Sequence, residues 1–285
     1  MFCKTAIMSL KRSYSGIRQA FINELMTPTE YGGKPTIMKI IAASICKQGG
    51  REYNQDYVAH VIEGDKACFV VCDGLGSYVG SEVASMLCTG KILDSFKTDI
   101  NEEQDVTTLE TALAYCQAAH NHVSSFKKKN PLISSSCTTV ACVITDLKTS
   151  VMSHIGDSRV YFFDGGQLKY QSKDHSLAQV AVDMGKCALK DIRTHKDQNK
   201  LTRVLGSDYY TEPDVKRETA PLKIGDAFIL CTDGFWEYIF EEEMEVALAA
   251  CSTPKEVLEN LEKLLLERVP SYNDNYTATV VMIVE

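Results

Sequence analysis

The chain has 285 residues, of which 45% are hydrophobic and 24% charged, a composition typical of a soluble globular protein with a sizeable core. No run of about 18 apolar residues occurs and no apolar segment follows the basic residues at the N-terminus, so we expect a cytoplasmic protein without a membrane span or secretory signal. The formal charge of −8 argues against general nucleic-acid binding and is compatible with a site that concentrates carboxylates for cations.

Residues 1–37 differ from the rest of the chain in charge and in pattern. They hold five basic and two acidic side chains, a net charge of +3, so the remainder carries −11. We expect an N-terminal extension, either packed on the body or loosely ordered, with a docking element for a partner as the alternative. Apolar residues at spacings of three and four predict one amphipathic helix in it, before a break rich in Pro and Gly: Leu10, Tyr14, Ile17, Phe21 and Leu25.

From residue 38 onward, short apolar runs separated by turn-rich pieces predict strands. The first three span 38–46, 57–62 and 67–72, and helices follow at about 80–96 and 107–128. Strands resume at 138–146, 150–155 and 159–164, where Asp-Gly-Gly marks a hairpin. After a looser stretch at 176–200 come strands at 215–219 and 227–231, helices at 241–251 and 254–268, and a last strand at 277–284. This order indicates an α+β fold of packed antiparallel sheets flanked by helices.

Several aspartates share one local setting, in which an apolar strand ends in a carboxylate at a turn. Asp73, Asp157 and Asp233 all have it, and Asp274 lies just before the last strand. A strand end is rigid and can hold a carboxylate in fixed geometry, but carboxylates gathered there repel one another unless cations lie between them. Oxygen ligands of this kind favour Mg²⁺ or Mn²⁺ over zinc. Because a single Asp-Gly is most often only a turn, these residues alone indicate a carboxylate-bound metal enzyme of unknown substrate.

Eight ordered motifs then make a resemblance specific, although any one of them is weak. The motifs are spread over nearly all of residues 38–285. This part of the chain resembles the PP2C-like (PPM) family of metal-dependent protein serine/threonine phosphatases, especially its bacterial members. The matching segments are 50–56 (GREYNQD), 71–77 with 80–85 (VCDGLGS, GSEVAS), 136–139 (SCTT), 154–159 (HIGDSR), 173–177 (KDHSL), 201–206 (LTRVLG), 231–234 (CTDG) and 274–277 (DNYT).

The resemblance implies a fold and a division of the chain. The fold would be a four-layer α-β-β-α sandwich, with two antiparallel sheets packed face to face, helices outside and a metal cleft at one end. Residues 38–285 would form the phosphatase domain. The looser stretch at 176–200 matches the family's flap beside the cleft, where a polar loop suits substrate selection.

The resemblance also implies a metal site built from residues of this chain. Asp73 would bridge two Mg²⁺ or Mn²⁺ ions, and the Gly74 carbonyl would bind one of them. Asp233 and Asp274 would complete the other. Asp157 matches the position that, with Asp233, holds a third ion in bacterial relatives.

The catalytic residues implied are Arg51, Asp56 and Asp73. Arg51 would face the substrate phosphate, where its planar guanidinium can meet two oxygens, and Asp56 would act through a metal-bound water. The reaction would be hydrolysis of phosphoserine and phosphothreonine in proteins by a water activated between the two ions. Three positions depart from the family pattern: Gln55 replaces a common Glu, Ser77 replaces a common Gly, and Leu75 replaces a His that is thought to protonate the leaving group in eukaryotic members.

Two alternatives stay open beside this interpretation. Cys187 and Arg193 have the Cys-x5-Arg spacing of a cysteine-dependent phosphatase, but no His precedes the cysteine and no glycine lies between the two. A non-catalytic PP2C-like binding or scaffold module would have lost metal ligands, whereas Asp73, Asp233 and Asp274 are all retained.

Two further expectations concern the binding partners of the protein and the state of its cysteines. The expected partners are a phosphoprotein substrate and a serine/threonine kinase or its targets, in signalling, with the protein acting as a monomer that binds neither nucleic acid nor membrane. Eleven cysteines without regular spacing predict buried, reduced thiols instead of a disulfide framework or a zinc site.

Overall fold

The structure is a computed structural model and describes residues 38–75 and 80–285. The chain divides into two units, Met1–Ile37 and Met38–Glu285. The amphipathic helix expected within residues 1–37 lies outside the described residues.

Two five-stranded sheets form the centre of this unit, and every strand pairing in them is antiparallel. The first sheet has the order β1 (Lys39–Lys47), β10 (Tyr276–Val284), β9 (Ala227–Cys231), β6 (Arg159–Asp164), β7 (Gln167–Gln171). The second sheet has the order β2 (Asp56–Glu63), β3 (Lys66–Asp73), β4 (Val140–Thr145), β5 (Ser150–Ile155), β8 (Asp214–Glu218).

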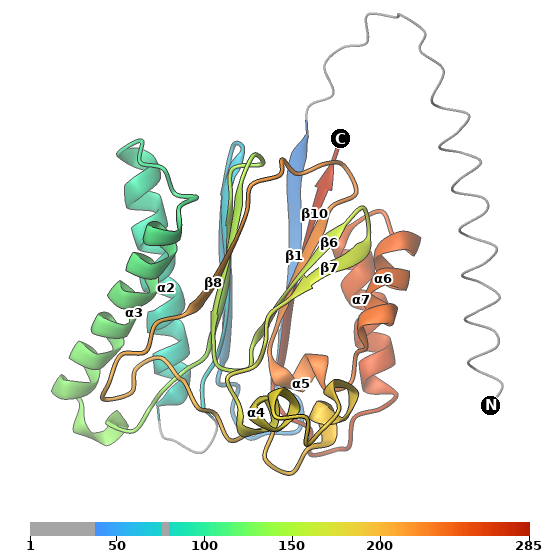
Figure 1. The fold of residues 1–285 in the computed structure, drawn as a ribbon. Coiled ribbons are helices and arrows are strands. Elements are labelled where there is room, and N and C mark those ends of the chain that lie inside the picture. Colours follow the sequence, from blue (N-terminus) through green and yellow to red (C-terminus); the bar gives the residue numbers. More distant parts are fainter. Residues whose placement is uncertain (1–37, 76–79) are drawn as a thin grey trace, which may run out of the picture. The chain divides into compact units, whose positions relative to one another are not determined.

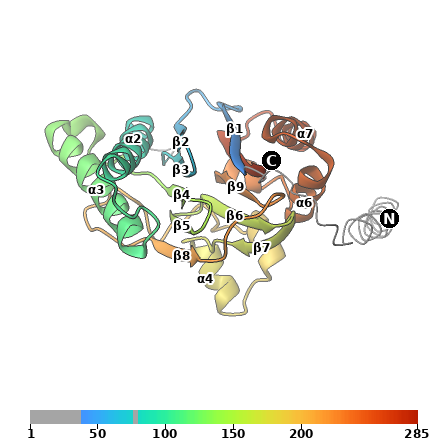
Figure 2. The same ribbon diagram turned by 90° about the horizontal axis from the view of Figure 1, so that it is seen from above.

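Helices cover the outer face of each sheet, which gives four layers (Figures 1 and 2). Two long helices lie on the second sheet: α2 (Ser81–Asn101) and α3 (Leu109–Lys129). Two further helices lie on the first sheet: α6 (Glu241–Ala250) and α7 (Pro254–Leu266). The short elements are α4 (Leu177–Asp183), α5 (Asp233–Trp236) and the 3₁₀ turns η1 (Pro131–Ile133) and η2 (Leu189–Thr194). The predicted α+β sandwich of two antiparallel sheets flanked by helices is confirmed.

Strand β3 shows how the sequence builds these layers. Its side chains alternate between the two faces, as the twofold period of a strand requires. Phe69 and Val71 pack between the two sheets, whereas Cys68, Val70 and Cys72 pack against α2 and α3. Both faces of the strand are therefore buried, which explains why its sequence is a continuous apolar run instead of an alternating one.

The cysteines follow the expectation for buried, reduced thiols. All ten in the described part of the chain are unpaired, and seven of them are buried. Five lie together in the layer between the second sheet and its helices: Cys68, Cys72, Cys88, Cys116 and Cys142.

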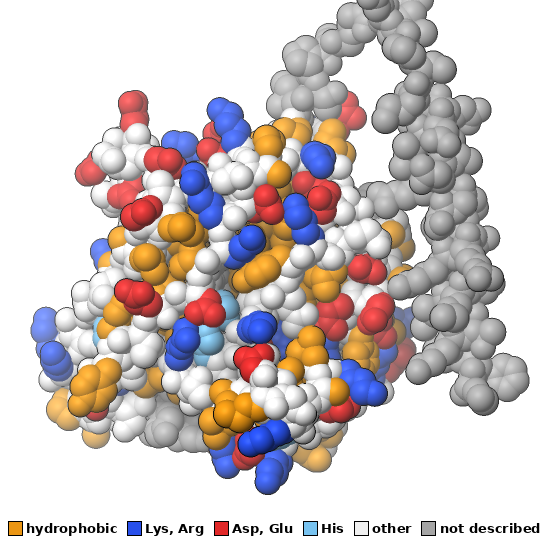
Figure 3. Space-filling model, viewed as in Figure 1, with side chains coloured by type: hydrophobic (Ala, Val, Ile, Leu, Met, Phe, Trp, Pro, Cys, Tyr) orange, Lys and Arg blue, Asp and Glu red, His pale blue; other side chains and the backbone are white. Residues whose placement is uncertain are grey.

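The face of the domain drawn in Figure 3 carries interspersed charges of both signs with scattered apolar side chains between them. Among the described residues, no helix combines the length and the apolar character needed to cross a lipid bilayer.

The antiparallel topology brings the ends of distant strands to one edge of the sandwich. Strand β3 ends where β2 begins, because Asp73 is paired directly with Asp56. In the first sheet, β9 ends where β10 and β6 begin, since Cys231 is paired with both Ala278 and Arg159. The residues at these ends form the candidate site.

Candidate active site

Carboxylates from both sheets converge at this shared edge. Asp73 ends β3, Asp157 lies in the turn between β5 and β6, Asp233 is the first residue of α5, and Asp274 precedes β10. A cleft of ≈ 390 Å³ opens between them, and it contains most of the predicted site residues. Its lining is Arg51, Asp73, Gly74, Leu75, Asp157, Asn199, Leu201, Val204, Asp233, Asp274 and Asn275.

Asp56 is the predicted site residue that does not line the cleft. It is 5% exposed and lies behind Asp73, its direct partner across strands β2 and β3. Thr232 donates a hydrogen bond to Asp56 Oδ2 (2.9 Å), but Oδ1 is buried with no hydrogen-bond partner among the described residues. Such an atom carries the full cost of desolvation unless something not yet bound satisfies it.

Burial and mutual repulsion make these carboxyl groups hard to ionise together. Burial raises the pKa of Asp73 well above its usual value, and the charges of Asp56, Asp233, Asp157 and Asp274 raise it further. Burial is also the main reason why the pKa of Asp56 rises to about 7 and that of Asp233 to about 6. Buried carboxylates in such numbers need counter-charge close by to remain ionised at neutral pH.

Two threonines hold the end of strand β3, and neither has a role that the sequence predicted. Thr139 Oγ1 accepts a hydrogen bond from the Asp73 backbone N–H (2.9 Å), and Thr138 Oγ1 donates to the Asp73 carbonyl (2.9 Å). Thr139 Oγ1 also bonds Ser158 Oγ (2.6 Å), next to Asp157. Asp73 and the turn that carries Asp157 are thereby connected through short side chains.

Arg51 lies at the cleft on the loop between β1 and β2, where it is paired with a carboxylate. Its Nη2 donates to Asp274 Oδ2 at 2.5 Å, and its side chain is 50% exposed. Asn275 fixes this loop, because its Oδ1 accepts from the Gln55 N–H and its Nδ2 donates to the carbonyls of Gln48 and Tyr53. The guanidinium is thus held beside the carboxylates while part of it faces solvent.

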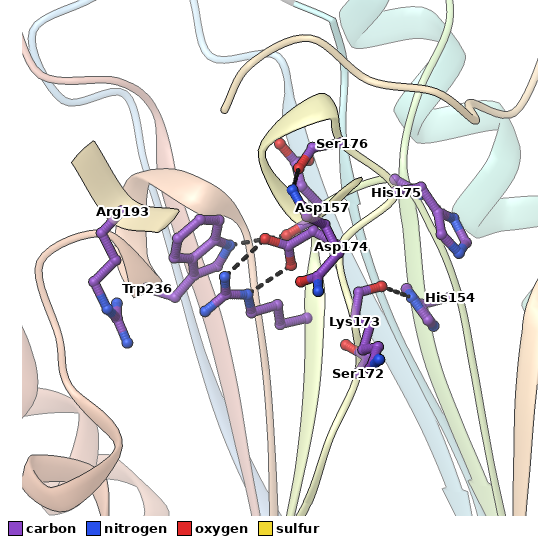
Figure 4. Close-up of polar contacts among 12 residues, drawn as sticks. His154, Asp157, Ser172, Lys173, Asp174, His175, Ser176, Arg193 and Trp236 are labelled. Carbon is purple, nitrogen blue, oxygen red and sulfur yellow. Dashed lines mark hydrogen bonds and ion pairs between the residues drawn. The ribbon is translucent and has the colours of Figure 1, made fainter. Parts of the chain in front are cut away.

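A buried ion pair supports the turn that carries Asp157 (Figure 4). Arg159 donates two hydrogen bonds of 2.7 Å to the two oxygens of Asp174, and both side chains are 2% exposed. The guanidinium of Arg159 also lies 3.4 Å from the centre of the Trp236 ring. Trp236, the last residue of α5, donates from Nε1 to the carbonyl of Asp157 (2.8 Å). One network therefore positions Asp157 and the short helix that begins at Asp233.

His175 holds the residue before Asp157 from two sides. Its backbone N–H donates to the Gly156 carbonyl (2.8 Å), and its ring Nδ1 accepts from the Gly156 N–H (3.2 Å). Gly156 has a φ of +95°, a conformation that favours glycine. His175 is therefore part of the support of this turn, and the sequence order Asp-His-Ser gave no indication of that contact.

A second cluster could in principle hold a metal ion: His154, His175 and Asp214. The hydrogen bonds argue against it. Because Nδ1 of His175 accepts from Gly156, the neutral ring carries its proton on Nε2, the atom that faces Asp214. Arg203 already supplies a cation there, with Nη1 2.7 Å from Asp214 Oδ1 and 3.3 Å from His175 Nε2.

The Cys-x5-Arg alternative does not form a phosphate loop. Arg193 is buried and donates to Glu241 Oε1 (2.7 Å), and its guanidinium lies over the rings of Trp236 and Phe240. Cys187 is outside the cleft lining. The Arg193 side chain is committed to packing α6 against η2, so it is not available for a phosphate at Cys187.

The residues of the cleft fit divalent cations. Four aspartates converge on the cleft and offer carboxylate oxygen atoms, one buried oxygen of Asp56 lacks a partner among the described residues, and the carboxylates raise one another's pKa. Hard ions such as Mg²⁺ and Mn²⁺ take oxygen ligands of this kind and supply the missing positive charge.

Comparisons with known proteins agree with the fold. A family model described as protein phosphatase 2C matches residues 48–265, so the chain belongs to the protein phosphatase 2C family. The serine/threonine phosphatase stp of Listeria innocua is 25% identical over 237 residues, which cover 82% of this chain and 90% of that protein. The predicted family and enzyme class are confirmed.

Two crystal structures show the same fold. The catalytic domain of the serine/threonine protein phosphatase PstP, in complex with two manganese ions, superposes with a TM-score of 0.72 at 24% identity, over 87% of this chain and all of that one. Serine/threonine phosphatase Stp1 from Staphylococcus aureus superposes with a TM-score of 0.74 at 21% identity, over 91% of this chain and all of that one.

Proposed function

We propose that this protein hydrolyses phosphoserine and phosphothreonine in proteins with the help of two Mg²⁺ or Mn²⁺ ions. The observation that carries the proposal is the convergence of Asp73, Asp157, Asp233 and Asp274 with Arg51 in one cleft at the end of the sandwich. Membership of the protein phosphatase 2C family and the two manganese ions of the PstP structure support it. We further propose that residues 38–285 form the phosphatase domain.

We propose that the two ions are held by Asp73, the Gly74 carbonyl, Asp233 and Asp274. Asp56, the partner of Asp73 across strands β2 and β3, would act through a metal-bound water. Asp157, together with Asp233, would hold a third ion. Bound ions at such a site lower the pKa of water, which makes it a nucleophile near neutral pH, and offset the charge of the phosphoryl oxygens.

The other contributions come from the chain itself. Arg51, half exposed beside Asp274, is placed to donate to two oxygens of the substrate phosphate. The Thr138–Thr139 pair and the Arg159–Asp174–Trp236 network keep the carboxylates in place, so little reorganisation is needed when substrate binds. Leu75 lines the cleft and cannot donate a proton to the leaving group, which leaves that role to water.

The test is Mn²⁺-dependent release of phosphate from a phosphothreonine peptide. Asp233→Ala should remove nearly all of the activity, because the metal site loses a ligand shared by more than one ion. Asp164→Ala is the matched control, since Asp164 lies at the opposite end of β6 and its side chain is 43% exposed. Wild-type rates from the Asp233 variant would refute the assignment.

A second measurement separates binding from chemistry. Arg51→Ala should raise KM more than it lowers kcat, because the lost contact is made with the phosphate already in the ground state. An unchanged KM would rule out this role for Arg51. If neither wild type nor variants release phosphate with Mn²⁺, while a phosphopeptide still binds, the chain is a non-catalytic module of the same family.

The setting of the reaction is also part of the proposal. Relatives named serine/threonine phosphatases support phosphoprotein partners, and we propose that these are a serine/threonine kinase or its targets, in signalling. We also propose a cytoplasmic protein that acts as a monomer, which size-exclusion chromatography with light scattering would test.

A further inference from the structure

The segment 184–200 reaches the cleft at its C-terminal end and carries a set of exposed lysines. We call it the basic flap: Lys186, Lys190, Lys196 and Lys200 are all exposed in it. The cleft lining includes Asn199 at its end, and Leu201 and Val204 just beyond. A peptide chain that places a phosphate in the cleft can therefore run past the end of this segment.

The charge of the basic flap is unusual for this chain and is largely unpaired. The segment contains four lysines and Arg193 but only two acidic residues, Asp191 and Asp197. Its formal charge is therefore +3, in a chain whose total is −8. Lys200 pairs with Asp197 (2.7 Å). The other three lysines make no ion pair within 4.0 Å in the described part of the chain. Figure 3 shows Lys and Arg side chains gathered at the lower edge of the molecule, where the yellow part of the chain lies in Figure 1.

The basic flap is anchored to the domain at several points. At its end, the Lys200 carbonyl accepts from the Leu177 N–H (2.9 Å), and Gln198 donates to Glu237 Oε1 (2.7 Å). In its middle, Ile192 is 1% exposed and Arg193 pairs with Glu241. The lysines therefore extend from a fixed backbone, which limits the entropy lost when they contact a ligand.

The cleft and the basic flap impose opposite requirements on a ligand. The cleft floor is a cluster of carboxylates, which repels acidic groups other than a phosphate that is offset by bound cations. The rim formed by the basic flap attracts acidic groups. A ligand that satisfies both has one phosphate in the cleft and further negative charge a few residues away along its chain.

We infer that the basic flap binds acidic or additionally phosphorylated residues that flank the phosphoserine or phosphothreonine of the substrate. The inference rests on the proposed function and names the class of substrate. Lys186, Lys190 and Lys196 are the residues that select it, and they act through binding and not through the chemical step.

The test compares matched phosphothreonine peptides that differ only in their flanks, acidic, neutral or basic. Wild type should cleave the acidic peptide with a kcat/KM about tenfold above that for the neutral one, which corresponds to ~1.4 kcal/mol and, shared among three lysines, lies within the range of exposed ion pairs. The preference should lie in KM and should weaken with added salt, because exposed charges are screened.

The variant K186Q/K190Q/K196Q should lose most of this preference with kcat unchanged. A control variant removes three exposed lysines at the opposite end of the sheets, K97Q/K148Q/K223Q, and should keep the preference. Hydrolysis of p-nitrophenyl phosphate, which has no flanking residues, should be the same in all three proteins.

The outcomes separate the two proposals. If wild type hydrolyses p-nitrophenyl phosphate with Mn²⁺ but shows no preference for acidic flanks, or if both triple variants lose it equally, the inference is wrong and the proposed function stands. If no substrate is hydrolysed, the proposed function itself fails. Lysine-dependent binding to vesicles of anionic lipid, with unchanged peptide selectivity, would assign the basic flap to a membrane surface and overturn the inference.

Discussion

Removal of the Asp174 carboxylate should destabilise the domain more than any loss of a surface ion pair. In Asp174→Ala, the Arg159 guanidinium stays buried at 2% exposure and loses two hydrogen bonds of 2.7 Å. What remains is Tyr161 Oη at 3.2 Å, Glu241 at 3.8 Å and the face of Trp236. Because breaking a buried pair leaves an uncompensated charge, we expect a loss of ~3–5 kcal/mol from the free energy of unfolding.

The matched control uses another aspartate of the same region. Asp183 pairs with Lys173 at 3.2 Å, but these side chains are 51% and 72% exposed. Asp183→Ala should therefore cost about 0–1 kcal/mol. The two variants remove the same chemical group, so their difference isolates the effect of burial.

The assay follows from the composition. Trp236 is the only tryptophan of the chain and contacts Arg159, so its fluorescence reports the region of the perturbation during urea unfolding. A typical domain is stable by about 5–15 kcal/mol, so the expected loss is a large shift of the midpoint. A loss below ~1 kcal/mol in Asp174→Ala would refute the reasoning, because it would mean that the guanidinium finds water or another anion after the change.

Three further results are expected. Mn²⁺ at a hundred times its Kd should stabilise the protein by ~2.7 kcal/mol, seen as a higher Tm, and EDTA should reverse it; equal Tm values would mean that no ion binds. Burial, and then the charges of His154 and Arg203, lower the pKa of His175 to about 4. Because the unfolded chain takes up this proton near pH 6.5, the contribution of His175 to stability should fall as the pH decreases from about 6.5 to about 4, and His175→Asn, compared with wild type in urea titrations, should remove that contribution. Gly49→Ala should destabilise more than Gly64→Ala in the same titrations, because both have φ near +60° but only at Gly49 would the new Cβ collide with a backbone carbonyl; equal losses would contradict this.

Most of the fold was predictable from local patterns. Strands β5, β6 and β9 have the predicted bounds, because their apolar runs are bounded by turns that interrupt them sharply. Strand β7 and helix α5 are among the elements that were not predicted individually. Strand β7 is short and polar at an edge, and α5 is a four-residue helix that begins within the Asp233-Gly234 turn signal.

The candidate site could be predicted only in part from the sequence. The aspartates and Arg51 stood out by their motifs, and the structure places them at one edge of the sandwich. The contacts that hold them were not predictable, because they join residues far apart in the chain: Arg51 with Asp274, or Trp236 with Asp157. No local period encodes such pairs, so only the packed structure reveals them.

The buried thiols beneath α2 and α3 give this domain a built-in probe of local unfolding. Burial raises the pKa of Cys116, and Cys68 and Cys142 lie with their sulfur atoms 3.9 Å apart in the same interior. An alkylating reagent reaches such sulfurs only while the helices are detached from the second sheet. The rate of alkylation therefore measures how often this local opening occurs. A bound ligand that suppresses this opening would slow the alkylation of the thiols, even in a variant without catalytic activity.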